Sequence, residues 1–209
     1  MRRMRTSDAT QALIDAGRRL GARGLIAAAE GNVSVRLGAD RILVTPAGRR
    51  KDELAPDDAV IVWLGHSDRE ARSPSGLAPT SDLEIHLALY AARPDIGSVA
   101  HAHLPSSLAL TMAGERTDPA DLPETALLIP RLPFVPFEAM GSDALARRVA
   151  LAMAEPPDPL PTVALLERHG AVAVGPDAAT AVDRLDLVEV LCRASMQALL
   201  LRGARASLG

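Results

Sequence analysis

Cysteine and aromatic residues are scarce in this chain of 209 residues. The single cysteine, Cys192, cannot form an internal disulfide, and its apolar helical surroundings are typical of a buried small side chain, with a catalytic thiol as the alternative. Aromatic residues make up 2% of the chain, so its core must be built from Ala, Leu and Val. The hydrophobic fraction of 48% is ample for such a core. The aromatic residues are Trp63, Tyr90, Phe134 and Phe137.

Long apolar runs and an excess of one charge are also missing from the sequence. No segment is long enough to span a bilayer, and the basic residues 1–5 lead into a helical pattern rather than the apolar stretch of a secretory signal. The formal net charge of −3 gives no reason to expect nucleic acid or a membrane as a partner. Together with the single cysteine, these features predict a cytoplasmic protein.

Apolar runs and helical patterns alternate along the chain, which favours one α/β domain over residues 1–209 with helices covering a sheet. Ser7 and Ser81 are the expected N-caps of two helices. The stretch 118–136 carries five prolines and is expected to be mostly irregular, like the loop at 69–79. The expected strands cover residues 42–45, 60–64, 99–103, 163–166 and 171–174. The expected helices cover residues 8–22, 81–93, 106–112, 143–154 and 177–202.

The sequence His101-Ala-His103 closes one of the expected strands. Side chains two residues apart in a strand leave the same face, roughly 7 Å apart by the strand rise, and that spacing suits two ligands of one metal ion. A catalytic metal site usually has a third protein ligand. His169, at a tight turn between two apolar strands, is the best candidate, because His66 has polar neighbours and His86 fits a packing role on a helix. Structural histidines remain the alternative to a metal site.

Two short segments are suited to holding an anion. Residues 30–34 offer a flexible backbone beside an amide and a hydroxyl, and Thr80-Ser81-Asp82 places two hydroxyls and free N–H groups at a helix start. Ordinary turns and an ordinary N-cap are the alternatives. Asp82, in the first helical turn, and Glu124, in the irregular stretch, are the carboxylates of interest, and the residues alone do not choose between them as an acid or base.

Several short segments, which span most of the chain, form an ordered set: Ala29–Ser34, Val44–Gly48, Pro79–Asp82, His86–Tyr90, Arg93–Asp95, Val99–Pro105, Leu165–Gly170 and Gly175. Individually they are short, but as an ordered set they resemble the class II aldolase/adducin family. The resemblance implies an α/β/α fold in which helices cover both faces of a central β-sheet. It also implies a homotetramer with active sites at the subunit interfaces.

The resemblance assigns a metal site and a substrate-binding site to particular residues. His101, His103 and His169 would bind Zn²⁺, with another divalent metal as the alternative. A small-molecule sugar phosphate would be the substrate. Its phosphate group would lie against Asn32, Gly48, Thr80 and Ser81.

The resemblance also suggests two different acid/base groups. The acid/base residue of the family would fall on Asp82, and a dehydratase of the same family uses a glutamate in the region of Glu124. Aldolases of the family use tyrosines to protonate the aldehyde oxygen. Tyr90 is the only tyrosine of this chain, so the region after His103 supplies no such group.

Three functions follow from this resemblance. The first is a zinc-dependent class II aldolase that cleaves a ketose 1-phosphate to dihydroxyacetone phosphate and an aldehyde, with Asp82 moving the proton. The second is a dehydratase or epimerase on a similar substrate, as in methylthioribulose-1-phosphate dehydratase, with Glu124 as the acid/base. The third is a non-catalytic, adducin-like binding module. The presence of all three histidine candidates argues against the third.

Overall fold

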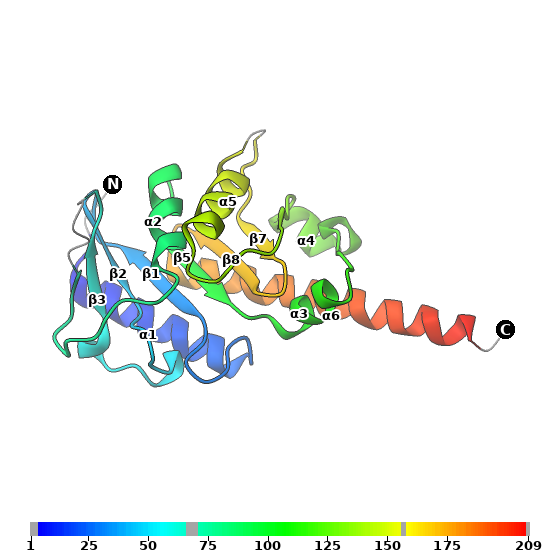
Figure 1. Ribbon diagram of the computed structural model, residues 1–209, viewed down its shortest axis with the longest axis horizontal. Helices are drawn as coiled ribbons and strands as arrows, with labels where there is room; N and C mark the ends of the chain where they lie inside the picture. Colours follow the sequence, from blue (N-terminus) through cyan, green and yellow to red (C-terminus); the bar gives the residue numbers. More distant parts are fainter. Residues whose placement is uncertain (1–3, 66–70, 156–157, 208–209) are drawn as a thin grey trace.

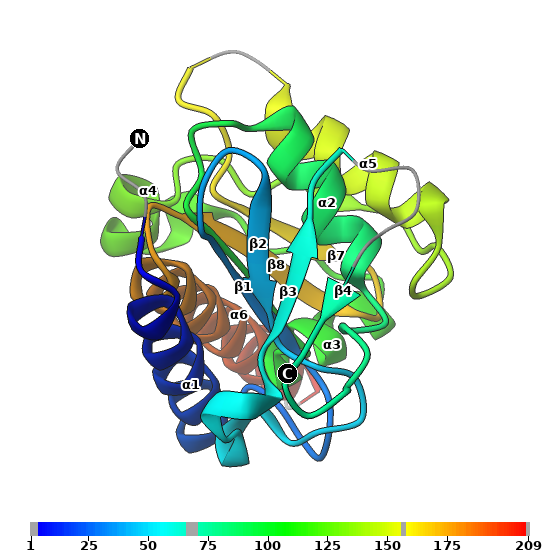
Figure 2. The ribbon, with the colours of Figure 1, turned by 90° about the vertical axis from the view of Figure 1, so that its left-hand side faces the viewer.

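The computed structural model of the chain describes residues 4–65, 71–155 and 158–207. Its centre is a sheet in the strand order β4-β3-β2-β1-β5-β8-β7-β6, with helices on both faces (Figures 1 and 2). The strands are β1 (Asn32–Arg36), β2 (Arg41–Val44), β3 (Val60–Trp63), β4 (Ala71–Arg72), β5 (Ser98–Ala102), β6 (Phe134–Val135), β7 (Val163–Leu166) and β8 (Gly170–Gly175). The helices are α1 (Thr6–Ala22), α2 (Leu83–Ala92), α3 (Pro105–Met112), α4 (Pro123–Leu128), α5 (Asp143–Ala154) and α6 (Ala178–Ala206), with 3₁₀ turns η1 (Lys51–Glu53), η2 (Pro56–Asp58) and η3 (Pro119–Asp121).

Strand β5 lies between β1 and β8, and both neighbours run antiparallel to it. The register places Asn32 of β1 on one side of His101 and Val172 of β8 on the other. Within the described residues, β6 and β7 form the one parallel pair of the sheet. Hydrogen bonding on both sides fixes β5, and it therefore fixes the directions in which its side chains leave the sheet.

The side chains of β5 divide between two separate cores. Ala100 and Ala102 pack in the core that α1 and α6 cover, whereas Val99 packs in the core that α2 and α5 cover (Figure 2). Because successive side chains alternate, His101 projects from the same face as Val99. Most of the buried hydrophobic side chains are Ala, Leu, Val and Ile, so the core expected from the scarcity of aromatic residues is confirmed.

The single α/β domain with helices on both faces of its sheet is confirmed, but two expectations of local structure were wrong. Residues 118–136 contain η3, α4 and β6. Pro119 and Pro123 begin η3 and α4, because a missing N–H costs little at the first helical position. Strand β1 includes Asn32–Ser34 of the expected anion-holding segment, for which the sequence predicted no strand. Its Asn32 and Ser34 are buried polar residues, which hide the strand from an apolar pattern.

The helix starts also differ from the sequence expectations. Helix α1 begins at Thr6 after an Arg5 N-cap, rather than after Ser7, and Asp82 rather than Ser81 precedes α2. The start of the expected loop at 69–79 and the position of His66 lie outside the described residues, and residues 71–72 form the short strand β4 instead of a loop. In the part of the chain that is described, no helix combines the length and the apolar character needed to cross a membrane.

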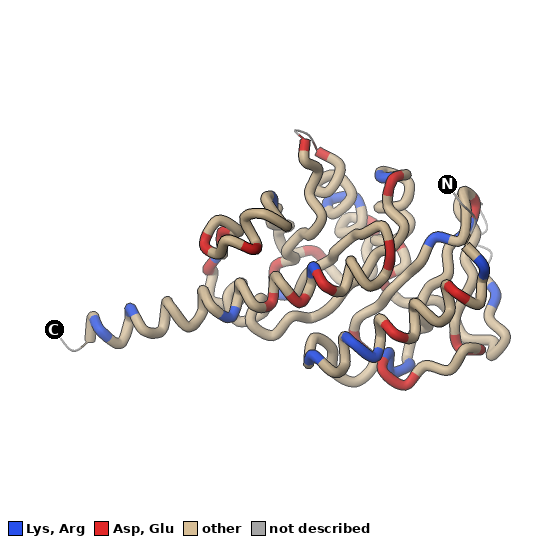
Figure 3. The backbone as a smooth tube through the Cα atoms, turned by 180° about the vertical axis from the view of Figure 1, so that it is seen from behind, with Lys and Arg blue, Asp and Glu red and all other residues tan. Residues whose placement is uncertain are grey.

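Helix α6 is 29 residues long and its C-terminal half extends beyond the sheet (Figure 1). Residues 194–201 of this helix include no acidic or basic residue, and Figure 3 shows a tan stretch near its C-terminal end. Leu200 and Leu201 are 67% and 63% exposed. The outer part of α6 therefore presents apolar side chains that this single chain does not cover.

Helix α1 approaches the 3₁₀ turn η1 closely at Gly17. A Cβ atom on Gly17 would overlap the Lys51 carbonyl oxygen and lie 2.8 Å from its carbon. The overlapping atoms belong to the backbone of η1, which cannot move aside like the end of a flexible side chain. Glycine at this position therefore permits the approach that anchors η1 against α1.

Substituting Gly17→Ala is expected to lower the free energy of unfolding by about 1–3 kcal/mol, because η1 must shift to remove the overlap. The matched control is Gly203→Ala in α6, where an added Cβ has no neighbouring atom within 4 Å among the described residues. That change should be neutral or stabilising by up to about 1 kcal/mol, since alanine favours helix. Urea unfolding of both variants checks this, and equal effects at the two sites would contradict it.

Candidate functional site

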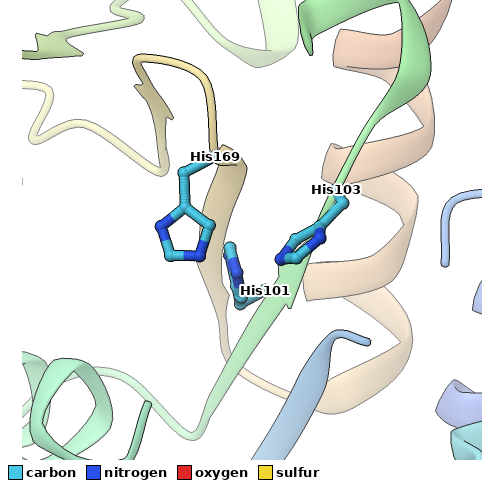
Figure 4. A group of neighbouring side chains, drawn as sticks. All are labelled: His101, His103 and His169. Atoms are coloured by element: carbon cyan, nitrogen blue, oxygen red, sulfur yellow. The ribbon is translucent and has the colours of Figure 1, made fainter. Parts of the chain in front are cut away.

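Three histidines meet at one end of β5. His101 lies on β5, His103 follows its last residue by one position, and His169 lies in the turn between β7 and β8 (Figure 4). Their ring centroids are 4.8–5.1 Å apart, and one nitrogen from each ring lies within 4.8 Å of the other two. The structure therefore brings together the three residues that the sequence analysis selected as metal ligands.

The β7–β8 turn reaches this position because of Gly170. This residue has φ of +99°, and a Cβ on it would overlap the Ala102 carbonyl oxygen and lie 2.7 Å from the His103 Cα. Only glycine combines this backbone conformation with so close an approach to β5. Arg168, two residues earlier, also has a positive φ, of 56°. The turn thus holds His169 against the end of β5.

The ring nitrogens of this cluster fit a metal ion. His101 Nδ1 donates to the Ala171 carbonyl oxygen at 2.9 Å, which leaves Nε2 as the free coordinating atom. Among the described residues, His101 Nε2 and both ring nitrogens of His169 are buried without a hydrogen-bond partner. Buried polar atoms without partners are costly, so their concentration here indicates a missing ligand.

The electrostatics of the cluster favour neutral imidazoles, the form that coordinates metal. Burial, followed by the neighbouring His169 and His103, holds the pKa of His101 well below its ordinary value. Burial also lowers the pKa of His169, partly opposed by the charge of Asp82. Glu30 Oε1 lies 3.3 Å from His103 Nδ1, an arrangement in which a carboxylate orients a metal-binding imidazole. The three residues could hold a divalent metal ion.

Asp82 places a carboxylate beside the histidines. Its Oδ2 accepts a hydrogen bond of 3.0 Å from Asn32 Nδ2 and lies 4.0 Å from His101 Nε2. Its Oδ1 is buried and has no hydrogen-bond partner among the described residues. Asp82 is 4% exposed, so this free oxygen faces the protein interior rather than bulk solvent. This carboxylate oxygen could take part in proton transfer at the cluster.

The expected phosphate-binding residues lie on two loops that the structure pairs. The Thr80 N–H donates to the Thr45 carbonyl oxygen at 3.1 Å, and a β-bridge joins Pro46 to Pro79. Gly48, with φ of +67°, and Ser81 are exposed at these loops, and Thr80 is buried with its hydroxyl accepting from the Asp82 N–H.

The fourth expected phosphate ligand, Asn32, is 1% exposed, and both ends of its amide are already hydrogen-bonded. Its Nδ2 donates to Asp82, and its Oδ1 accepts from His86 Nε2 at 2.6 Å. His86 is a buried, hydrogen-bonded residue of α2, as the sequence analysis expected.

Lys51 is a residue of this region that the sequence analysis missed. It is 1% exposed, and its Nζ donates to the carbonyl oxygens of Ala29 and Arg49, both at 2.6 Å. Burial lowers its pKa, opposed by the charge of Asp82. The signal was present in the composition, because Lys51 is the only lysine among the 23 Lys and Arg residues. Its ammonium group joins the loop before β1 to the loop that carries Gly48.

Two other candidates do not join the cluster. Glu124 lies in the exposed first turn of α4, which packs on η3 and α6, and no hydrogen bond or ion pair links it to the histidines or Asp82 among the described residues. Cys192 is fully buried, and burial together with Glu189 raises the pKa of its thiol to about 12. Such a thiol is unreactive, so the structure supports the buried small side chain and not the catalytic alternative.

Comparison with known proteins identifies the family. A family profile described as the Class II Aldolase and Adducin N-terminal domain matches residues 11–196. The chain belongs to the class II aldolase and adducin family. The family membership expected from the sequence motifs is therefore confirmed over most of the chain.

Relatives of this class II aldolase-family chain carry names of more than one reaction. A methylthioribulose-1-phosphate dehydratase of Acidiphilium cryptum is 30% identical over 86% of this chain and 85% of that protein. A 5-methylthioribulose-1-phosphate/5-deoxyribulose-1-phosphate aldolase of Rhodospirillum rubrum is 40% identical over 49% of this chain and 43% of that protein. Several matches to curated relatives likewise span about half the length of those proteins.

A solved relative shares nearly the whole fold of this class II aldolase-family chain. The structure of l-fuculose-1-phosphate aldolase from Thermus thermophilus superposes with a TM-score of 0.79 at 28% identity, covering 95% of this chain and 97% of that chain. The mixed α/β architecture is therefore that of the family.

Replacing a ring of the histidine cluster should weaken metal binding. We expect His169→Ala to lower the affinity for Zn²⁺ by more than about 100-fold, because a direct ligand matters more than the outer partners of a site. Equilibrium dialysis followed by elemental analysis measures this affinity. Glu124→Gln, on exposed α4, is the control and should bind as the wild type does. Unchanged binding by His169→Ala would exclude the cluster as the metal site.

Proposed function

We propose that this protein is a metal-dependent lyase that cleaves a ketose 1-phosphate to dihydroxyacetone phosphate and an aldehyde. The observation that carries this proposal is the buried, unpartnered Asp82 Oδ1 beside three converging histidines, among the residues that the structure describes. This arrangement would join a metal-binding site to one acid/base group. The family supports enzymatic chemistry of this class.

The residues of the site take separate roles in this proposal. His101, His103 and His169 hold the ion, for which we propose Zn²⁺, since three imidazoles with an open position suit it. The bound ion would supply a Lewis acid that polarises the carbonyl and hydroxyl oxygens of the ketose and stabilises negative charge as the carbon–carbon bond breaks. Asp82 would move the proton at the reacting carbon.

The phosphate group of the substrate would supply binding energy away from the reacting bond. Its ligands would come from the two paired loops, through the hydroxyls of Thr80 and Ser81 and the backbone at Gly48, with Asn32 contributing its remaining amide hydrogen. Lys51 supports this role, because its buried ammonium group lies between the Ala29 and Arg49 carbonyls and adds positive charge near these loops.

A dehydratase of a methylthioribulose-like 1-phosphate is the second candidate. Its support is the Acidiphilium cryptum dehydratase, which matches 86% of this chain. In that reaction the acid/base would be Glu124, which would have to approach the histidine cluster from exposed α4. The contacts of Asp82 favour the aldolase, since Asp82 already lies at the cluster.

We further propose a cytoplasmic homotetramer with active sites at its subunit interfaces. The exposed leucines 200 and 201 and the uncharged stretch 194–201 of α6 support an interface, since apolar patches of this kind are generally covered by a partner.

The two reactions leave different products from the same substrates. We expect the Zn²⁺-loaded protein to convert 5-deoxyribulose 1-phosphate or 5-methylthioribulose 1-phosphate with release of dihydroxyacetone phosphate. A coupled assay for that triose phosphate, with mass spectrometry of the remaining product, follows both outcomes. Substrate loss with release of water and no triose phosphate would replace the aldolase with the dehydratase. Absence of any turnover over a wider set of ketose 1-phosphates would overturn the proposal.

Paired carboxylate variants identify the acid/base group. Asp82→Asn is expected to lower kcat by about 10²- to 10⁴-fold, because it removes the proton-transfer group while keeping the size of the side chain. Glu124→Gln should retain kcat within about threefold, since Glu124 makes no contact with the cluster among the described residues. Steady-state kinetics with matched metal content measures both. The reverse ranking would move the role to Glu124.

A further inference from the structure

A chain of hydrogen bonds runs from Asp82 into the core between the sheet and α2. Each of its five residues is at most 4% exposed. It connects the carboxylate at the histidine cluster, through Asn32, with His86 and Tyr90 of α2 and Ser34 of β1. The links are Asp82 Oδ2 to Asn32 Nδ2 at 3.0 Å, Asn32 Oδ1 to His86 Nε2 at 2.6 Å, His86 Nδ1 to Ser34 Oγ at 2.7 Å, and Ser34 Oγ to Tyr90 OH at 3.0 Å.

The chemistry of these groups fixes the direction of every bond. The Asp82 carboxylate accepts from the Asn32 amide N–H, so the Asn32 carbonyl oxygen is the end that faces His86. An amide oxygen only accepts, and His86 Nε2 must therefore carry the proton. In a neutral imidazole the other nitrogen is then an acceptor, so the Ser34 hydroxyl donates to Nδ1 and Tyr90 donates to Ser34.

His86 can keep this pattern of hydrogen bonds because its imidazole ring stays neutral. It is completely buried, and burial lowers its pKa to about 3. A protonated imidazole would donate from both nitrogens and would break the match with the Ser34 hydroxyl hydrogen. The single proton on Nε2 is thus retained across the ordinary pH range.

The hydrogen-bond chain ends at Tyr90, which is shielded from solvent. Tyr90 is 3% exposed, and the Arg36 guanidinium lies 4.5 Å from the centre of its ring. Arg36 is itself held by the carbonyl oxygens of Ile96 and Tyr90. Burial raises the pKa of the Tyr90 hydroxyl. A hydrogen-bond chain that ends on a buried phenol does not exchange protons with solvent. The chain therefore orients these five side chains and does not conduct protons.

We propose that His86 is a positioning residue, which locks the Asn32 amide in one orientation and thereby holds the Asp82 carboxylate with Oδ1 free for substrate. A rotated Asn32 amide would set its N–H₂ group against the Nε2–H of His86 and its oxygen against the carboxylate. Both contacts are repulsive, so the orientation is unique. The expected effect on catalysis rests on the role proposed for Asp82, whereas the donor and acceptor assigned to each hydrogen bond do not.

The direction of the hydrogen bonds at His86 can be measured without substrate. In the Zn²⁺-loaded protein labelled with ¹⁵N-histidine, we expect NMR to show His86 with a protonated Nε2 and an unprotonated Nδ1 near neutral pH. Loss of the signal in His86→Gln assigns it. A proton on Nδ1, or on both nitrogens, would overturn the inference. Because no turnover is involved, this result is independent of whether the proposed lyase activity exists.

The positioning role is tested with two variants at one position. His86→Leu removes both hydrogen bonds, and His86→Gln keeps an amide N–H that can donate to Asn32 Oδ1. We expect His86→Leu to lower kcat by about 10- to 100-fold with metal content unchanged, and His86→Gln to recover most of the loss.

Several outcomes of this comparison would count against the role. Unchanged kcat in His86→Leu, a loss of metal that accounts for the loss of rate, or equal defects in both variants would each overturn it. If His86→Leu does not fold, the rate of His86→Gln decides, since it must remain within about tenfold of the wild type. Absence of wild-type turnover would overturn the proposed function. The NMR result would still decide the direction of the hydrogen bonds at His86.

Discussion

The antiparallel pairing of β5 with β1 and β8 is the constraint on which the site depends. It places His101 beside Asn32 on one side and Val172 on the other. The alternation of side chains then directs His101 to the face covered by α2 and α5, where Asp82 and His86 lie. Because β5 is hydrogen-bonded along both edges, it can carry functional side chains at its end without local movement.

The burial of polar groups on that face is the main energetic cost of forming the site. An unpaired buried donor or acceptor costs about 1–3 kcal/mol, so each such group needs a partner. Asn32, Ser34 and His86 satisfy one another. Among the described residues, four of the seven buried side-chain atoms without a partner lie at the site: Asp82 Oδ1, His101 Nε2 and both ring nitrogens of His169. The fold thus satisfies the supporting groups and leaves open the atoms that could bind a ligand.

Two close backbone approaches hold the surrounding loops in place. Gly170 lets the β7–β8 turn rest against the end of β5, and Gly17 lets α1 pack on η1, which carries Lys51. Lys51 in turn joins the loop before β1 to the loop of Gly48 through two carbonyl oxygens. The histidine cluster and the expected phosphate loops are therefore positioned by contacts between segments that are distant in sequence.

Local features of this protein could be predicted from its sequence. The His-Ala-His pattern at the end of an apolar run identified β5 and predicted that His101 and His103 lie together, and periodicity located most of the helices and strands. Prediction failed for β1 and α4, because buried polar residues broke the apolar pattern of β1 and helix-initiating prolines looked like breakers in α4. The family likeness came from motifs, not from periodicity.

Which of these features meet in space depends on the tertiary structure. The strand order brings His169 to within reach of His101, and it brings Asn32 against Asp82 although 50 residues separate them. The same packing buries Lys51, whose local sequence is polar, and leaves Glu124 exposed on α4. Local propensity carries no information about register or burial between distant segments, because these depend on long-range pairing and on how two cores pack against opposite faces of one sheet.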